Sequence, residues 1–116
     1  MARRSQRMRL LDIAAQMTAI EAALVDRAAE DLRADWLLRS AIERGVEIIS
    51  ESSRHLDAAL IAAHPAIPWR RVADIGNWLR HAYEQVDPAL ILAIVTDHFP
   101  ALHLAVAEML TQIPED

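Results

Sequence analysis

The chain has 116 residues, of which 53% are hydrophobic, and its formal net charge at pH 7 is −5. This length suits a single domain, and the apolar content excludes an intrinsically disordered chain. The absence of cysteine excludes a disulfide scaffold, a cysteine-ligated metal centre and a thiol nucleophile. We expect one domain over residues 1–116, located in the cytoplasm. We expect no membrane contact, because no apolar run reaches the roughly 18 residues of a spanning helix.

The charge is unevenly distributed along the chain. All twelve basic residues are arginines, and four of them lie within residues 3–9, before the first acid. From residue 10 onward eight arginines face 17 acids, so the surface as a whole repels a nucleic-acid backbone. Any contact with RNA or DNA must therefore be local and made by arginine, whose guanidinium binds phosphate with two hydrogen bonds. Residues 1–8 are expected to form a frayed, arginine-rich tail.

Apolar residues spaced by three or four predict the first two long helices. The first covers about residues 5–27, and residues 28–33 are a connection or a bent continuation. Its apolar stripe is Leu10, Ile13, Met17, Ile20 and Leu24. Asp35 is a typical N-cap for a second helix that ends near Ser53. Gly45 in the middle of that helix indicates the close approach of a neighbouring helix, because glycine otherwise weakens a helix.

Two further long helices follow a segment that is rich in proline. Residues 56–63 predict a short helical turn, and Pro68 suits the start of the third long helix. Asp87 and Pro88 predict the cap and first turn of a last helix, which Pro100 should kink or restart. The core stripe expected on this last helix is Leu90, Ile94, His98, Leu102, Val106 and Met109. With no strand pattern, the expected fold is all-α, an antiparallel bundle of four or five helices.

Most residue patterns that carry chemistry are missing. No two histidines have the spacing of a helical metal site, so we expect no metal and no cofactor. No serine sits in a nucleophile elbow, and two glycines are too few for a phosphate loop. One cluster remains on the third long helix, where Asn77 and His81 share a face, Arg80 precedes the histidine and Tyr83 follows it. By itself the cluster is weak, and its spacing favours the solvent-exposed face of an amphipathic helix with a histidine near its C-terminus.

Residues 37–110 resemble the HepT-like branch of the HEPN superfamily in the order and spacing of several motifs. These motifs are Ala41-Ile42-Glu43-Arg44, Glu47-Ile48-Ile49-Ser50-Glu51-Ser52-Ser53-Arg54, His64-Pro65-Ala66-Ile67-Pro68-Trp69-Arg70, Asn77, Arg80-His81-Ala82-Tyr83, Val86-Asp87 and Asp97-His98-Phe99-Pro100-Ala101-Leu102. The resemblance implies a homodimeric helical bundle that acts as a toxin and cleaves RNA as a metal-independent endoribonuclease. It also implies an antitoxin partner, a nucleotidyltransferase of the MNT type, which neutralises the toxin. In some pairs the antitoxin adds AMP to a tyrosine that corresponds to Tyr83; the alternative is that Tyr83 only packs or lines the site.

The sequence departs from the family pattern at one position. The family's site combines an arginine, a polar residue and a histidine, and here Asn77 and His81 match the last two. Gly76 stands where the arginine is expected. In one interpretation the cation is lost, and the protein is a weak or inactive nuclease that serves as partner or substrate of the nucleotidyltransferase. In the other, Arg80 supplies the guanidinium, because it shares a helix face with Gly76.

The second long helix offers further candidates for this site. Arg44 and Arg54 lie in the stretch expected to pack beside the cluster, and Glu47 and Glu51 are placed to hold these arginines. The expected chemistry is general acid–base cleavage of RNA, with His81 as base or acid and a guanidinium that stabilises the phosphorane.

Overall fold

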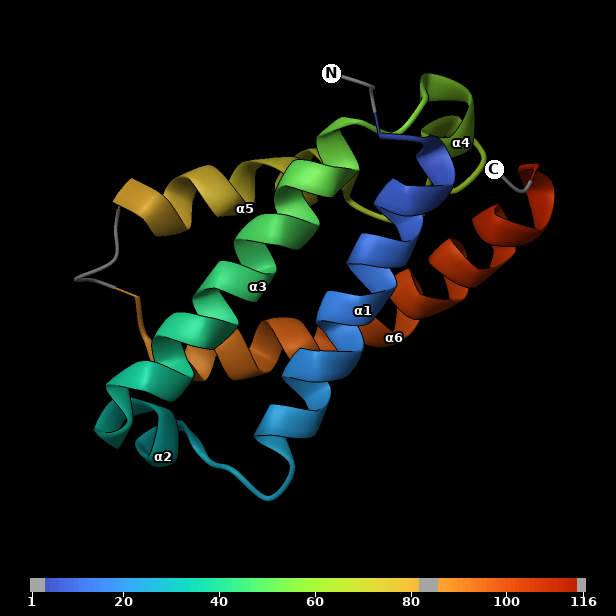
Figure 1. The fold of residues 1–116 in the computed structure, drawn as a ribbon. Helices are drawn as coiled ribbons and strands as arrows, with labels where there is room; N and C mark the ends of the chain where they lie inside the picture. Colours follow the sequence, from blue (N-terminus) through green and yellow to red (C-terminus); the bar gives the residue numbers. More distant parts are fainter. Residues whose placement is uncertain (1–3, 82–85, 115–116) are drawn as a thin grey trace.

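The computed structural model describes residues 4–81 and 86–114, and these residues form six α-helices and no strand. The four long helices are α1 (Gln6–Leu24), α3 (Trp36–Arg54), α5 (Trp69–His81) and α6 (Pro88–Gln112) (Figure 1). The two short ones are α2 (Ala29–Ala34) and α4 (Ala58–Ala62). The all-α prediction is confirmed. The number exceeds the expected four or five, because residues 29–34 form a separate helix instead of a connection or a continuation.

Helices α1 and α3 form the central antiparallel pair (Figure 1). Gln6, at the start of α1, donates a hydrogen bond to the carbonyl of His55, the C-cap of α3, and accepts one from the amide of Asp57, the N-cap of α4. At the other end of the pair, Ile20 lies against Gly45, where an added Cβ would come within 2.8 Å of the Ile20 Cδ1 atom. The close approach expected at Gly45 is confirmed. The whole stripe expected on α1 is buried: Leu10, Ile13, Met17, Ile20 and Leu24.

The expected caps fix where α3 and α6 begin. The Asp35 carboxylate accepts a hydrogen bond of 3.1 Å from the amide of Leu38 in the first turn of α3. The Asp87 carboxylate accepts one of 2.9 Å from the amide of Ala89, and Pro88 occupies the first position of α6. Such side-chain acceptors satisfy amides that have no partner within the helix, so both predicted helix starts are confirmed.

The N-terminal segment is more ordered than expected for a tail. The Ser5 hydroxyl accepts a hydrogen bond of 3.0 Å from the amide of Met8, and α1 begins at Gln6. Arg4 forms an ion pair of 2.8 Å with Asp12 on α1. Helix α1 therefore starts at Gln6, close to the start near residue 5 that is expected for the first helix, because the Ser5 side chain caps its first turn.

Pro100 lies inside α6, which continues through it as one helix (Figure 1). The axis changes direction near the middle of the helix, as expected where proline removes a backbone hydrogen bond, so Pro100 kinks the helix and does not restart it. The second half buries its predicted stripe of Leu102, Val106 and Met109. The first half differs from the expectation, because Ile91 and Phe99 are buried whereas Leu90 and His98 are exposed. Ile94 is half-buried and packs against the core, as expected.

Helix α6 is also long and apolar enough to cross a membrane, with a mean hydropathy of 1.7 over an 18-residue window. Unbroken apolar runs in the chain are nevertheless short, because polar residues such as Asp97 interrupt α6. Length and composition are equally typical of a core helix, and α6 packs on α1 and α2. Only 28% of the window is buried, so much of its apolar surface is uncovered.

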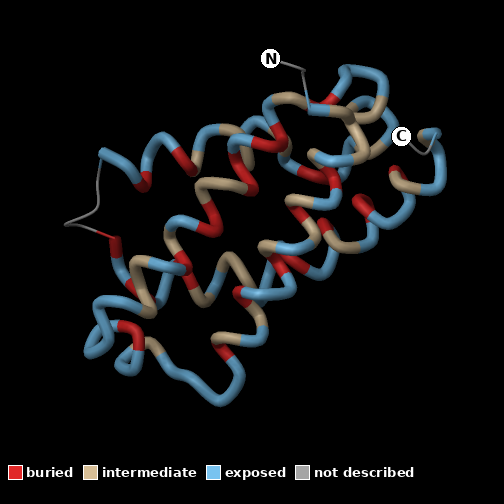
Figure 2. The backbone as a smooth tube through the Cα atoms, in the orientation of Figure 1, coloured by how far each residue is buried: buried red, intermediate tan, exposed pale blue. Residues whose placement is uncertain are grey.

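The buried positions face inward between α1, α3 and α6 (Figure 2). Helix α5 packs on α3 and covers little of α6. An apolar groove of about 490 Å³ therefore remains between α3, α5 and the first half of α6. We call it the α5–α6 groove. Its main apolar walls are Val46, Ile49, Val72, Ile75, Leu90 and Ile94.

Candidate functional site

A buried serine sets the distance between α3 and α5. The Ser50 hydroxyl accepts a hydrogen bond of 3.1 Å from the amide of Gly76 and donates one of 2.8 Å to the carbonyl of Ala73. A Cβ atom added at Gly76 would lie 2.7 Å from the Ser50 oxygen and 2.8 Å from its Cβ. Helix α5 can lie this close to α3 only because position 76 has no side chain.

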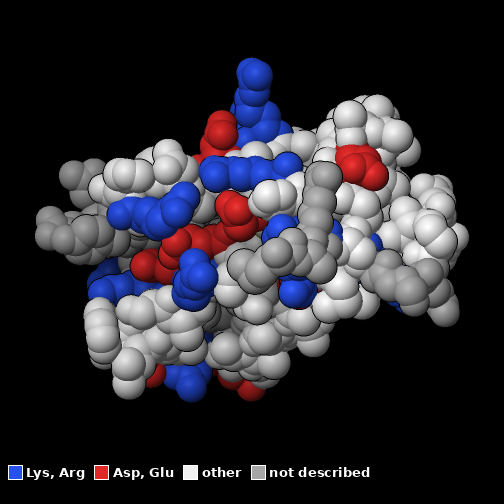
Figure 3. Space-filling model, turned by 45° about the horizontal axis from the view of Figure 1, so that its top comes forward, with Lys and Arg blue, Asp and Glu red and all other residues white. Residues whose placement is uncertain are grey.

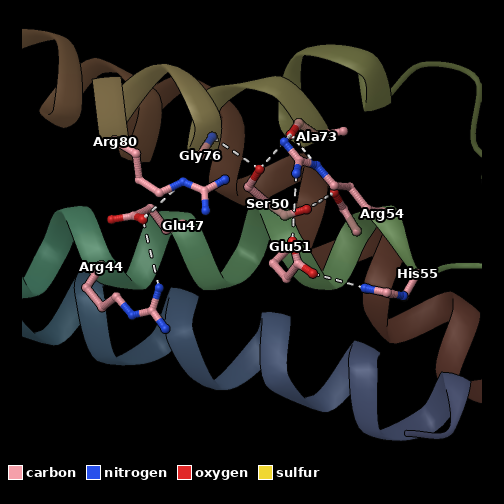
Figure 4. A network of polar contacts seen from close by, with 10 residues as sticks. Arg44, Glu47, Ser50, Glu51, Arg54, His55, Ala73, Gly76 and Arg80 are labelled. Carbon is pink, nitrogen blue, oxygen red and sulfur yellow. Dashed lines mark hydrogen bonds and ion pairs between the residues drawn. The ribbon is translucent and has the colours of Figure 1, made fainter. Parts of the chain in front are cut away.

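Beside this contact lies a polar cleft of about 280 Å³, which we call the α3–α5 cleft. Its lining is Arg44, Glu47, Ser50, Glu51, Arg54, Gly76 and Arg80 (Figure 4). Arginine and acidic side chains gather closely over this part of the surface (Figure 3). The structure thus brings together Arg80 with the supporting candidates Arg44, Arg54 and Glu51.

Glu47 lies at the centre of the first charge cluster in the cleft (Figure 4). Its Oε1 atom is 3.8 Å from Nη1 of Arg44 and 3.8 Å from Nε of Arg80. The Glu47 side chain is 18% exposed, whereas the side chains of Arg44 and Arg80 are 70% and 55% exposed. A carboxylate that is largely buried therefore lies between two guanidiniums that reach into solvent.

Arg54 belongs to a second cluster, which fastens α3 to α5. Its Nε donates a hydrogen bond of 2.8 Å to the Ala73 carbonyl, which also accepts a bond from Arg54 Nη2. Glu51 lies 3.7 Å from Arg54 Nη1, and its other oxygen is 3.0 Å from Nε2 of His55. The hydrogen bond from the His55 side chain lowers the pKa of Glu51. The Arg54 guanidinium is therefore held by hydrogen bonds to the backbone of α5.

His81 and Asn77 lie beside the cleft and not in it. Both are exposed, on the face of α5 next to the one that carries Gly76 and Arg80. Nδ1 of His81 is 2.8 Å from the backbone carbonyl of Asn77. Because a carbonyl only accepts, Nδ1 carries the proton of the neutral ring and Nε2 is left as a proton acceptor. Asn77 thus orients the imidazole through its backbone, a role that does not depend on its amide side chain.

Tyr83, the remaining site residue predicted from the sequence, lies outside the described residues. Two polar residues of α3 were missed. One is Ser50, whose role depends on tertiary packing and leaves no local signal. The other is Glu43. Glu43, Glu47 and Glu51 follow one another at intervals of four residues, and this regular spacing could have revealed Glu43.

Glu43 carries a poorly compensated charge. Burial raises the pKa of Glu43, Arg39 at 4.0 Å lowers it, and the negative charge of Glu47 raises it. In the described part of the chain the Glu43 Oε2 atom has no hydrogen-bond partner. The charged form of Glu43 is therefore disfavoured in the folded protein.

Metal ligands do not gather in the part of the chain that the structure describes. Across residues 4–81 and 86–114, no group of three or more histidine and carboxylate side chains is close enough to hold a metal ion.

The chain is similar in sequence to proteins that are named as ribonucleases. The family described as "Ribonuclease HepT-like" matches residues 13–109. A protein named "Probable ribonuclease HepT" from Thermococcus cleftensis is 34% identical over 100 residues, covering 86% of this chain and 91% of the relative. One named "Putative RNase" from Caldanaerobacter subterraneus is 31% identical over 81 residues, covering 70% and 72%. No solved structure matches significantly. The chain belongs to the HepT-like ribonuclease family, as its motifs had indicated.

Proposed function

We propose that this protein is a metal-independent endoribonuclease that cleaves RNA and acts in the cytoplasm as the toxin of a toxin–antitoxin pair. Membership of the HepT-like family supports ribonuclease chemistry. One observation carries the proposal for this chain. An exposed imidazole, His81, has Nδ1 fixed on a backbone carbonyl and lies next to the arginine-lined α3–α5 cleft.

The proposed reaction is attack of a ribose 2′-hydroxyl on the adjacent phosphorus. Nε2 of His81 removes the hydroxyl proton, and the new O–P bond forms as the bond to the 5′-oxygen breaks. The products are a 2′,3′-cyclic phosphate and a 5′-hydroxyl, whose proton comes from the protonated His81 of a second copy. Arg80 stabilises the charge of the phosphorane, because Gly76 has no side chain that could do so.

The proposed enzyme is a homodimer that uses the α5–α6 groove. This groove is apolar, it borders the helix that carries His81, and it is lined by Leu90, which is 42% exposed. Trp78 on α5 is also 42% exposed. Exposed apolar surface such as that of the α5–α6 groove marks an interaction site. A second copy seated along α5 would bring two histidines to one substrate.

The proposed antitoxin is a nucleotidyltransferase of the MNT type that adds AMP to Tyr83. This part of the proposal rests on the resemblance of Arg80-His81-Ala82-Tyr83 to the family motif. A phosphodiester-linked AMP two residues from His81 would place negative charge where the RNA backbone must bind, so it would inhibit by repulsion and by occupying space.

One observation favours a second candidate function. The expected arginine is replaced by Gly76, and removal of an electrostatic contact to the transition state typically lowers a rate on the order of 10²–10³-fold. In this alternative the protein is an inactive helical dimer that serves as partner or substrate of the nucleotidyltransferase.

Cleavage of RNA by the purified protein in EDTA, beside His81→Ala, tests the proposal. We expect wild-type cleavage and a loss of at least 10²-fold in the variant, with equal helicity by circular dichroism. Equal cleavage by both proteins would exclude His81 as the catalytic base. No cleavage by either would favour the second candidate, and mass spectrometry of Tyr83 after incubation with the nucleotidyltransferase and ATP would then test it.

A further inference from the structure

We propose that the α3–α5 cleft binds one phosphodiester of an RNA strand through Arg44 and Arg80, and that Glu47 is the positioning residue for both guanidiniums. The inference rests on the proposed ribonuclease function and specifies which part of the substrate the cleft takes. It assigns different roles to three arginines that line the same cleft.

The contacts of the three arginines separate them. Arg54 is held by two hydrogen bonds to the Ala73 carbonyl and by Glu51, so its guanidinium is a structural link between helices. Within the described part of the chain, Arg44 and Arg80 have one charged neighbour each, and it is Glu47 in both cases. Two guanidiniums thus remain available to a ligand, and they come from opposite walls of the cleft (Figure 4).

Glu47 contacts Arg80 in a way that leaves the binding end of its guanidinium open. The contact is made to Nε, on the side of the group, so both terminal nitrogens face the cleft beside Gly76 (Figure 4). A guanidinium needs two parallel N–H donors to bind phosphate with two hydrogen bonds. The distances of 3.8 Å are those of ion pairs and not of hydrogen bonds, so a phosphate can enter without breaking a tight contact.

Charge and position also fit a phosphodiester. The cleft holds three arginines and two glutamates, a local excess of one positive charge on a chain whose net charge is −5. A single phosphodiester carries one negative charge and would neutralise it. Because Arg80 and His81 are consecutive on α5, a strand held in the cleft passes directly beside the proposed base.

Binding of a fully 2′-O-methylated RNA oligonucleotide, followed by fluorescence anisotropy, tests the cleft without requiring cleavage. This probe has no 2′-hydroxyl nucleophile. We expect Arg44→Ala and Arg80→Ala each to weaken binding about tenfold and to lower the salt dependence by about one phosphate contact. The matched control is Arg27→Ala, which removes the same charge at an exposed position beyond α1. A loss with Arg27→Ala as large as with the other two would overturn the assignment.

Glu47→Gln tests the positioning role. We expect equal or tighter binding of the methylated RNA, because a negative charge is removed, but at least a tenfold lower kcat on cleavable RNA, with Glu47→Asp restoring part of it. An unchanged kcat would exclude the positioning role. If the protein cleaves no RNA, the positioning role can be tested by nuclear magnetic resonance. The Arg80 Nε–H signal in ¹H–¹⁵N spectra should weaken in Glu47→Gln. An unchanged signal would contradict the inference. If the protein cleaves no RNA but the anisotropy experiment gives the expected losses of binding, the proposed nuclease activity is rejected and the proposed phosphodiester binding by the cleft is retained.

Discussion

Two glycines of this chain allow close helix approach, but their neighbours differ in how easily they can move. At Gly45 an added Cβ would meet the ends of flexible side chains, Ile20 and Gln16. At Gly76 it would meet Cβ and Oγ of Ser50, close to the backbone of α3. A side-chain end can rotate away, whereas a Cβ moves only with its helix.

We therefore predict that Gly76→Ala lowers the free energy of unfolding by about 1–3 kcal/mol. For Gly45→Ala we predict a smaller loss, because the gain in helix propensity of about 1 kcal/mol offsets the repacking of Ile20. Urea denaturation of both variants measures the difference. Ser50→Gly should recover part of the loss when combined with Gly76→Ala. A larger loss at Gly45 than at Gly76 would contradict this explanation.

The raised pKa of Glu43 predicts that its contribution to the free energy of unfolding depends on pH with the opposite sign to that of a paired carboxylate. Burial raises its pKa above the ordinary value of 4.5, so the charged form is less favourable in the folded protein than in the unfolded chain. The cost is fully present above the raised folded pKa and disappears as the pH falls through it toward 4.5.

Glu43→Gln should accordingly raise the melting temperature at pH 7 and have little effect well below pH 4.5, where Glu43 is protonated in both the folded and the unfolded state. Thermal unfolding at the two pH values checks the prediction. Glu108→Gln removes an exposed carboxylate of α6 and serves as the control. The same stabilisation by Glu43→Gln at both pH values would show that the effect does not come from titration of this group.

At the scale of the helices, the sequence predicted most of what local rules control. The caps at Asp35 and Asp87 and the buried stripe of α1 follow from local chemistry and periodicity. The error in the first half of α6 has a different origin. That half is apolar on two sides, and periodicity cannot decide which side faces the core and which faces the α5–α6 groove.

For the site, too, the sequence predicted what local spacing within one helix determines, and no more. Local spacing on α5 identified Asn77, Arg80 and His81, but it could not separate the two faces that place Arg80 in the cleft and His81 beside it. The contact between Ser50 and Gly76 joins residues 26 positions apart and depends on tertiary packing. This packing explains why position 76 holds glycine and not arginine, which the motif alone left unexplained.

At the scale of the whole molecule, the apolar surface is unevenly covered. Leu90 and Leu104 both lie on α6 and are 42% and 75% exposed, but only Leu90 lines the α5–α6 groove. If a second copy covers the groove, a charge at Leu90 must be buried without a partner in the dimer, whereas a charge at Leu104 remains in water. The two leucines therefore form a matched pair on one helix.

We predict that the wild-type protein sediments at about twice its mass of 13.0 kDa, and that Leu90→Asp shifts it to the monomer at micromolar concentration. Leu104→Asp should remain dimeric, although it replaces the more exposed leucine. Analytical ultracentrifugation of the three proteins measures this directly. A monomeric wild type, or dissociation by Leu104→Asp with a dimeric Leu90→Asp, would place the interface elsewhere. The proposed reaction would then lack the second histidine that protonates the leaving oxygen, since that group comes only from a copy seated along α5.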